Sequence, residues 1–172
     1  MKCVRIPILI LVCAALISGC SKSNTNALPS SAPRLPEQAQ AKLPTIKLWL
    51  GSEELITEMA LTDEQQMTGM MFRTNIVENE AMIFVHPTPR TAAYWMTNCF
   101  VPLSIAYIDT DGVILEIHDL QPHNAISVVS AATNVRFGLE TSQGWFQRHN
   151  VSTGAVIRTE RGSLSETFLR RP

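Results

Sequence analysis

The sequence predicts a mainly β domain, a compact antiparallel β-sandwich or barrel-like fold with one or two short helices. About seven short segments of alternating apolar and polar residues recur along the chain, and turn-forming residues separate them. The 172 residues are 45% hydrophobic and 17% charged, the composition of an ordinary globular domain. A formal net charge of −1 gives no strongly basic surface, so nucleic acid is not expected as a partner.

The predicted domain begins with a hairpin. Ile46–Leu50 alternates apolar and polar side chains, residues 51–52 (Gly-Ser) turn the chain, and Leu55–Leu61 forms the second strand. Further strands are predicted at Ala81–Val85, Ala92–Met96, Leu103–Ile108, Val113–Ile117, Val135–Glu140 and Ala155–Ile157. Strands this short, with so few helical segments between them, favour an antiparallel sandwich or barrel.

Two short helical segments interrupt the strands. Residues 62–65 (Thr-Asp-Glu-Gln) form a capping box that predicts a helix N-terminus. The helix it opens is expected to carry Met67, Met70 and Met71 on one face. Gly144–His149 is expected to form a short helical turn.

Residues 109–112 (Asp-Thr-Asp-Gly) predict a hairpin turn between two of the strands. They also begin like an EF-hand calcium loop, but Leu120 occupies the position of the bidentate glutamate and Val113 that of a third acid. His118 and His123 are interpreted as solvated loop histidines, since a Pro-containing loop separates them. No metal site and no cofactor are predicted.

The N-terminus has the features of an export signal. Lys2 and Arg5 precede an apolar run, Ile6 to Leu16, that is too short to span a bilayer. The run leads into residues 16–20 (Leu-Ile-Ser-Gly-Cys), which resemble the bacterial lipoprotein box. That resemblance implies a signal peptide at residues 1–19, a diacylglycerol on Cys20 and an acylated amino terminus. An ordinary signal peptide is the alternative.

The predicted location of the protein is therefore the cell envelope. A lipoprotein of this kind is membrane-anchored in the cell membrane or the outer membrane, and its domain faces the periplasm or the cell exterior. Palmitate is the acyl label expected at the N-terminus. Ser21 follows Cys20 where an aspartate would resemble an inner-membrane retention signal, which favours the outer membrane.

The mature chain is expected to be a tether followed by one domain. Residues 20–43 are rich in Ser, Asn, Ala, Pro and Gln without apolar periodicity, which is typical of a disordered linker. Residues 44–158 carry the apolar pattern of a folded domain. Residues 159–172 are polar and basic, and a frayed terminus is expected there in preference to an interaction tail.

Cysteine usage excludes an internal disulfide in the mature protein. Cys3 and Cys13 leave with the signal peptide and Cys20 is blocked, so Cys99 is the one remaining thiol. A lone thiol among apolar residues is expected to be a small buried side chain, with a nucleophile or a metal ligand as the alternatives.

Two stretches carry side chains that are unusual for a core. Residues 69–73 follow the predicted helix with bulky apolar residues and an arginine. In an extended segment Tyr94 and Met96 share one face, while Trp95 points to the other. A tryptophan beside the amide of Asn98 and an arginine can line a pocket for a sugar, a peptide or a planar group. Packing of Trp95 in a second apolar layer is the alternative.

These stretches resemble the bacterial and archaeal family DUF192. Gly69–Arg73 resembles the family's GLM-x-R, Ala81–Val85 its GMLFVF, and Tyr94–Asp109 its FWMKNT-x-IPLDI-x-FID. Gly112, Leu139, Glu140, Gly144 and Gly154 fall where the later family positions fall. The resemblance runs from Ile46 to Ile157, and it implies a compact, mainly β domain, often exported, with no established activity.

The sequence departs from the family pattern at polar positions. Thr97 stands where the family has lysine, Ser104 where it has aspartate, and Cys99 where it usually has threonine. If the family's polar residues form a site, this chain lacks two of its charges. The candidate ligand-binding residues that remain are Arg73, Trp95, Asn98, Asp109 and Glu140.

Three functional hypotheses follow. The leading hypothesis is a lipid-anchored binding module for a small ligand, a glycan, a peptide or another envelope component. Its pocket is expected to be lined by Trp95, Asn98 and Arg73. The second is a structural or interaction lipoprotein in which Arg73 forms a buried ion pair with Glu140 or Asp109. The third is a hydrolase of envelope polymers that uses Asp109 and Glu140 as acid and base. No nucleophile motif supports catalysis, so no catalytic residue is assigned.

Overall fold

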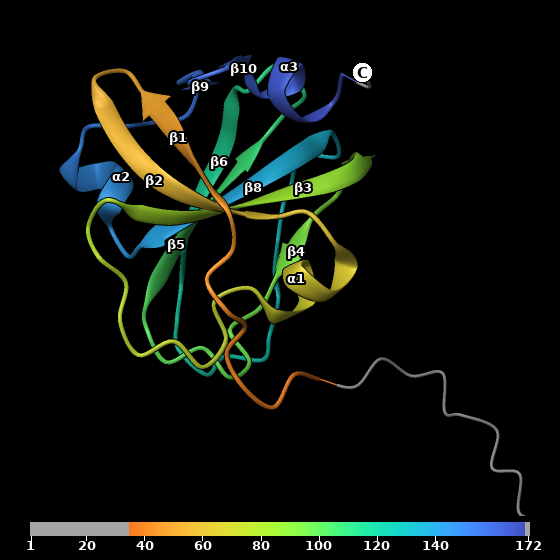
Figure 1. Cartoon of the computed structure of the whole chain (residues 1–172), viewed down its shortest axis with the longest axis vertical. Coiled ribbons are helices and arrows are strands. Elements are labelled where there is room, and N and C mark those ends of the chain that lie inside the picture. Colours follow the sequence, from red (N-terminus) through yellow and green to blue (C-terminus); the bar gives the residue numbers. More distant parts are fainter. Residues whose placement is uncertain (1–34, 171–172) are drawn as a thin grey trace, which may run out of the picture. The chain divides into compact units, whose positions relative to one another are not determined.

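Ten strands and three short helices make up residues 35–170, the part of the chain that the computed structural model describes (Figure 1). The strands are β1 (Thr45–Leu50), β2 (Glu53–Ala60), β3 (Glu80–Arg90), β4 (Ala93–Tyr94), β5 (Leu103–Ile108), β6 (Ile114–Leu120), β7 (Val128–Val129), β8 (Val135–Ser142), β9 (Ile157–Thr159) and β10 (Gly162–Ser163). The helices are α1 (Asp63–Thr68), α2 (Trp145–Arg148) and α3 (Leu164–Phe168).

Eight strands form one large sheet in the order β10-β9-β1-β2-β3-β8-β5-β6, and β4 pairs with β7 separately. Neighbouring strands of the large sheet are antiparallel, except that β2 and β3 run parallel. A parallel pair needs a crossover connection, and residues 61–79 with α1 supply it. The predicted mainly β class is therefore confirmed, but the sheet is mixed and is not closed into a barrel.

Helix α1 begins at the predicted capping box. The Thr62 hydroxyl accepts the N–H of Gln65 at 3.2 Å, and the Gln65 side chain accepts the N–H of Thr62 at 3.0 Å. The helix ends earlier than the methionine pattern predicts, because Gly69 adopts φ +46° and breaks it. Met70 and Met71 thus follow the helix in a turn, where both are buried.

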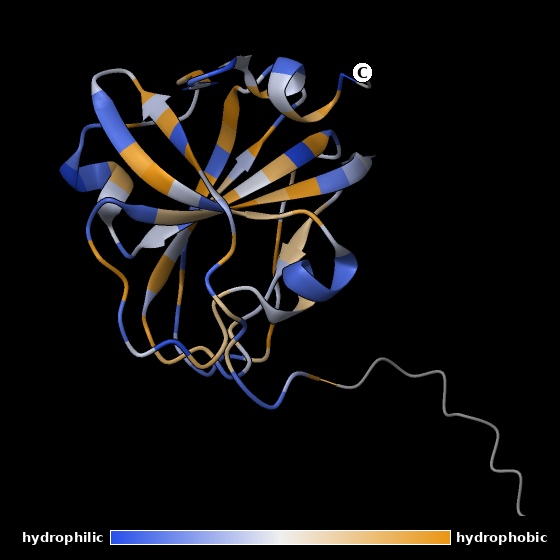
Figure 2. Cartoon of the chain, viewed as in Figure 1, coloured by the Kyte–Doolittle hydropathy of each residue, from blue (hydrophilic) through white to orange (hydrophobic). Residues whose placement is uncertain are grey.

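The two faces of the large sheet bury separate apolar cores, and hydropathy alternates along the strands (Figure 2). The first core includes Trp145 and Phe146 of α2 and Leu164 of α3. The second core packs the sheet against the connecting segments, which contribute side chains such as Met71 and Met96. Loops therefore cover the second face, and they bring their polar residues close to the sheet.

The C-terminal segment is folded, so the expectation of a frayed tail from residue 159 is wrong. β10 pairs with β9, and a second capping box opens α3: the Ser163 hydroxyl accepts the Glu166 N–H at 3.1 Å, and the Glu166 carboxylate accepts the Ser163 N–H at 2.9 Å. Leu164 is fully buried against the sheet. The Ser-x-x-Glu pattern at residues 163–166 was the sequence signal for this helix.

The end of the predicted tether also contacts the domain. The N–H of Leu43 donates to Glu58 at 2.7 Å, and Lys42 forms an ion pair with Glu80 at 2.7 Å. Residues 1–34 lie outside the described part of the chain, and with them the predicted signal peptide and Cys20. Within residues 35–170, no helix combines the length and hydropathy needed to cross a membrane.

Candidate functional site

Three connecting segments meet at one end of the large sheet: residues 69–79, 95–102 and 121–127. We call this surface the loop end; it is at the bottom of Figure 1. Backbone hydrogen bonds join the segments: Phe72 N–H to Asn98 C=O at 2.7 Å, Met96 N–H to Asn124 C=O at 2.8 Å, and His123 N–H to Cys99 C=O at 3.1 Å. The three segments therefore hold one another in place.

The loop end contains unusual backbone conformations. Phe72, Asn98 and His123 have φ values of +63°, +59° and +60°, and each belongs to a different one of the three segments. A bulky aromatic residue rarely adopts this left-handed conformation, because the side chain crowds its own backbone. Such conformations concentrate at ligand-binding and active sites, where the surrounding structure enforces them.

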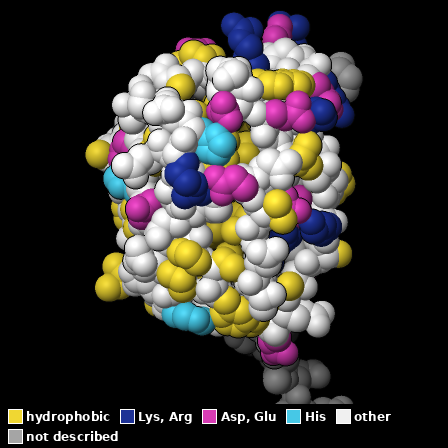
Figure 3. Space-filling view, turned by 90° about the vertical axis from the view of Figure 1, so that its left-hand side faces the viewer, with side chains coloured by type: hydrophobic (Ala, Val, Ile, Leu, Met, Phe, Trp, Pro, Cys, Tyr) yellow, Lys and Arg dark blue, Asp and Glu magenta, His cyan; other side chains and the backbone are white. Residues whose placement is uncertain are grey.

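Aromatic rings are exposed on the same surface. The Phe100 ring meets the Phe72 ring edge-on at a centroid distance of 6.0 Å, and its centroid lies 5.2 Å from that of His123. Phe100 is 44% exposed and Trp95 is 40% exposed. In Figure 3, hydrophobic side chains gather on the lower part of the face shown. The loop end thus offers aromatic surface to solvent instead of burying it.

The alternation predicted for the segment that carries Trp95 is confirmed. Tyr94 and Met96 are buried, whereas Trp95 between them is exposed. Tyr94 lies in β4, which is extended, so successive side chains leave on opposite sides. The alternative placement of Trp95 within an apolar layer is therefore wrong.

A groove of about 390 Å³ adjoins the loop end. It is lined by Gln40, Lys42, Phe72, Arg73, Thr74, Asn75, Val77 and Glu80. Most of these side chains are polar, and Arg73 connects the groove to the interior. The volume falls in the range of about 300–1,000 Å³ that is typical of small-molecule sites.

Arg73 forms a bidentate ion pair with Glu58. The guanidinium Nη2 lies 2.8 Å from Oε2, and the two side chains are only 13% and 7% exposed. Burial raises the pKa of Glu58, but hydrogen bonds from Arg73 and from the Leu43 N–H outweigh it and hold the pKa below its ordinary value. The predicted partners of Arg73, Glu140 and Asp109, were wrong, because the parallel pairing of β2 with β3 places Glu58 beneath this loop.

Glu140 is a buried carboxyl group beneath the loop end. It lies in β8 opposite Met82 and Ile105 and is 4% exposed. Burial raises its pKa to about 8, and the nearby charge of Arg73 lowers the pKa only in part. Because this pKa lies above 7, the protonated form of Glu140 is favoured at neutral pH.

Asp109 lies away from the other candidates. Its Oδ1 accepts the N–H groups of Asp111 at 3.0 Å and Val113 at 2.9 Å, which confirms the predicted hairpin turn. Ile105 is the register partner of Glu140, and Asp109 follows Ile105 by four residues. Asp109 therefore lies roughly 13 Å further along the strand direction than Glu140. The structure brings Arg73, Trp95 and Asn98 to the loop end with Glu140 beneath, and it separates Asp109 from them.

Several site residues escaped the sequence reasoning: Glu58, Phe72, Phe100 and His123. For Glu58 a signal existed, because it is an acidic residue inside a strand whose neighbours are apolar or uncharged. For the others no local pattern exists, since their role depends on three loops meeting.

Cys99 is a buried thiol, as predicted. It is 4% exposed, and burial together with the charge of Glu140 raises its pKa to about 12. His118 lies in β6 and pairs with Glu116 at 2.9 Å, so its placement in a loop was wrong. Across residues 35–170, no three His, Cys, Asp or Glu side chains are grouped as metal ligands.

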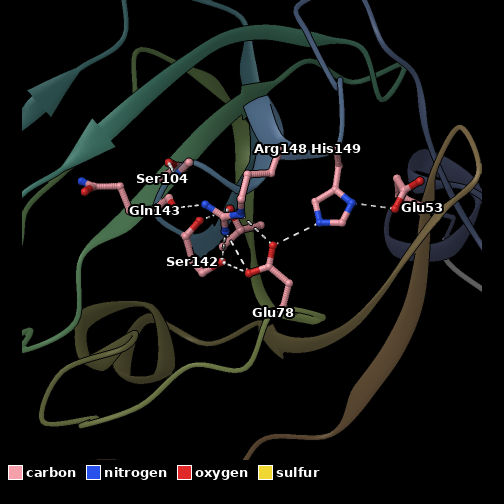
Figure 4. A network of polar contacts seen from close by, with 9 residues as sticks. Glu53, Glu78, Ser104, Ser142, Gln143, Arg148 and His149 are labelled. Atoms are coloured by element: carbon pink, nitrogen blue, oxygen red, sulfur yellow. Dashed lines mark hydrogen bonds and ion pairs between the residues drawn. The ribbon is translucent and has the colours of Figure 1, made fainter.

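A second polar cluster lies beside α2 (Figure 4). Arg148 donates to Glu78 through Nε at 2.9 Å and Nη2 at 2.8 Å, and His149 bridges Glu53 at 2.7 Å and Glu78 at 3.1 Å. The hydrogen bond from Arg148 is the main cause that lowers the pKa of Glu78 to about 2. These groups satisfy one another and fasten α2 to β2 and to the segment that precedes β3, so the cluster is interpreted as structural.

The chain is similar to a known protein family and to solved structures. The sequence profile of DUF192, described as "Uncharacterized ACR", matches residues 47–159. No curated protein matches the chain. A "putative transcription regulator" from Sinorhizobium meliloti 1021 is similar in structure, with 27% identity, a TM-score of 0.65, and an alignment over 70% of this chain and 98% of that one. A protein of unknown function from Novosphingobium aromaticivorans DSM 12444 has 25% identity and a TM-score of 0.63, over 75% and 94% of the two chains.

Proposed function

We propose the function of this chain from its own site, because it belongs to the DUF192 family, whose description assigns no activity. The protein is a lipid-anchored binding module of the cell envelope, which holds a small ligand, a glycan or a peptide at the loop end. The observation that carries this proposal is that Phe72, Asn98 and His123 all have positive φ where three segments meet, on a surface with exposed aromatic rings and an adjoining groove.

The chemistry of the loop end suits recognition. The Phe100 and Trp95 rings offer apolar faces for a sugar ring or an apolar side chain. Arg73 and Lys42 line the adjacent groove and can direct donors at a ligand's oxygens. Hydrogen bonds between the segments preorganise the surface, which reduces the entropy lost on binding.

Binding is favoured over hydrolysis by the placement of the acids. Paired glycosidase carboxyl groups lie within about 10 Å of each other, whereas Asp109 occupies a turn roughly 13 Å along the strand from the level of Glu140. Cys99 is held as a protonated, buried thiol, which makes it a poor nucleophile. A role in transcription is not proposed, since the net charge of −1 offers no field for nucleic acid.

The ligand proposal is tested with the mature protein and two probe sets, peptidoglycan-derived glycan fragments and a peptide library. We expect saturable binding of one set, and Trp95→Ala and Phe100→Ala are each expected to weaken it by about tenfold, the effect of losing one aromatic contact. Val156→Ala is the matched control, because Val156 is 46% exposed and bridges Val113 beside the β5–β6 turn. Equal affinity in all three variants would exclude the loop end as the site.

The anchor is tested separately by labelling cells with palmitate. Cys20→Ala is expected to abolish incorporation and to release the protein from the membrane fraction, since acyl chains supply the membrane affinity. Cys99→Ala serves as the control, because the Cys99 thiol is buried in the domain. Undiminished labelling of Cys20→Ala would contradict the lipoprotein proposal while leaving the ligand proposal standing.

A further inference from the structure

The pairing of β3 with β8 is interrupted in the second half of β3. Val85 is paired with Phe137 and Arg90 with Val135, so four residues of β3 stand opposite the single residue Arg136. Two of the four are prolines, which have no N–H to donate to the ladder. Irregularities of this kind redirect side chains and are frequent beside functional sites.

A cavity of about 420 Å³ opens at this interruption. Figure 1 shows the ends of β3 and β8 side by side, between α3 and α1. The walls of the cavity include the apolar side chains of Leu61 and Phe168, together with His86, Arg136 and Asp63. The cavity is therefore distinct from the groove at the loop end, since Arg136 lies four residues along β8 from Glu140, roughly 13 Å.

Arg136 lines this cavity, and its guanidinium has an unsatisfied donor. The Nη1 atom is buried and has no hydrogen-bond partner within the described chain. No carboxylate of residues 35–170 forms an ion pair with Arg136, although Asp63 lines the same cavity. Leaving a buried charged donor unpaired is costly, and an anionic oxygen that the Arg136 guanidinium reaches from the cavity would offset that cost.

His86 supplies a second polar group. Its Nε2 lies 3.1 Å from the Tyr94 hydroxyl, and these two atoms form a hydrogen bond. Burial, with the charges of Arg90 and Arg136, lowers the pKa of His86 to about 4, so the ring is neutral near pH 7 and carries one N–H. In the tautomer in which the Tyr94 hydroxyl donates to Nε2, this N–H is at Nδ1. Gly138 permits this arrangement, because a Cβ there would clash with the Tyr94 hydroxyl oxygen.

We propose that this cavity binds a small anion, a carboxylate or a phosphoryl group, through the guanidinium of Arg136 and the imidazole of His86 in the tautomer that carries its hydrogen on Nδ1. Arg90 adds positive charge near His86, and the two arginines outweigh the single acidic side chain of the lining, Asp63. The apolar walls then contact the body of the ligand. This site is independent of the loop end, so it stands whether or not the loop end binds a ligand.

The test is calorimetric titration of the full mature chain at constant ionic strength with three probes: inorganic phosphate, acetate and benzoate. We expect saturable one-site binding of at least one probe. Arg136→Gln is expected to weaken it by about 10- to 100-fold, the effect of a lost charge-assisted hydrogen bond, while Arg136→Lys retains part of the affinity. Arg158→Gln is the matched control, because Arg158 is an exposed arginine on β9.

The three probes separate the ligand classes. Tighter binding of phosphate identifies a phosphoryl ligand, and tighter binding of benzoate than acetate identifies a carboxylate with an apolar body; either outcome supports the site. No saturable binding of any probe, or an equal loss in Arg136→Gln and Arg158→Gln, overturns it. Near-ultraviolet circular dichroism of each variant shows that the fold is intact before the affinities are compared.

Discussion

Replacing Arg73 with methionine is expected to lower the free energy of unfolding by about 3–5 kcal/mol, the usual effect of removing one partner from a buried ion pair. The Glu58 carboxylate is then left buried without its bidentate donor, although the Leu43 N–H remains. Denaturant unfolding at neutral pH measures the change.

The double variant Glu58→Gln, Arg73→Met is expected to regain much of that loss, because no uncompensated charge stays buried. Lys47→Met is the matched control: Lys47 also pairs with a glutamate, but both side chains are more than a third exposed, so little or no change in stability is expected. If Arg73→Met and Lys47→Met lowered the free energy of unfolding equally, the buried Arg73–Glu58 ion pair would be no more important for stability than an exposed one.

Replacing Glu140 with glutamine is expected to stabilise the protein in alkaline solution. The folded-state pKa is about 8 against an ordinary value of 4.5, so the folded protein holds this proton more tightly than the unfolded chain does. The stability associated with the group is complete below the ordinary pKa and is lost as pH rises through the folded pKa. At about pH 9 the variant should gain on the order of 3 kcal/mol, because glutamine carries no charge to bury.

The measurement is urea unfolding of both proteins at about pH 5 and about pH 9. Wild-type stability should fall between the two values, and that of Glu140→Gln should fall much less. Asp111→Asn is the control, because it removes one acidic group that is exposed in the β5–β6 turn. Parallel pH profiles of the wild type and Glu140→Gln would show that Glu140 ionises normally within the fold.

Features that depend on neighbouring residues could be predicted from the sequence. The hairpin of β1 and β2, the turn after β5, the capping box of α1 and the alternation around Trp95 all follow from spacing and side-chain chemistry within a few residues. The burial of Cys99 follows from the apolar residues around it. The residues within or beside each element are therefore sufficient to predict these features.

Features that depend on the path of the chain were decided by the tertiary structure. The crossover through α1 makes β2 and β3 parallel, and only then does Glu58 lie beneath Arg73. The loop end and the unpaired Nη1 of Arg136 likewise require segments far apart in sequence to meet. Register and crossover are set by the sum of many long-range contacts, so no local pattern in the sequence determines which charges become partners.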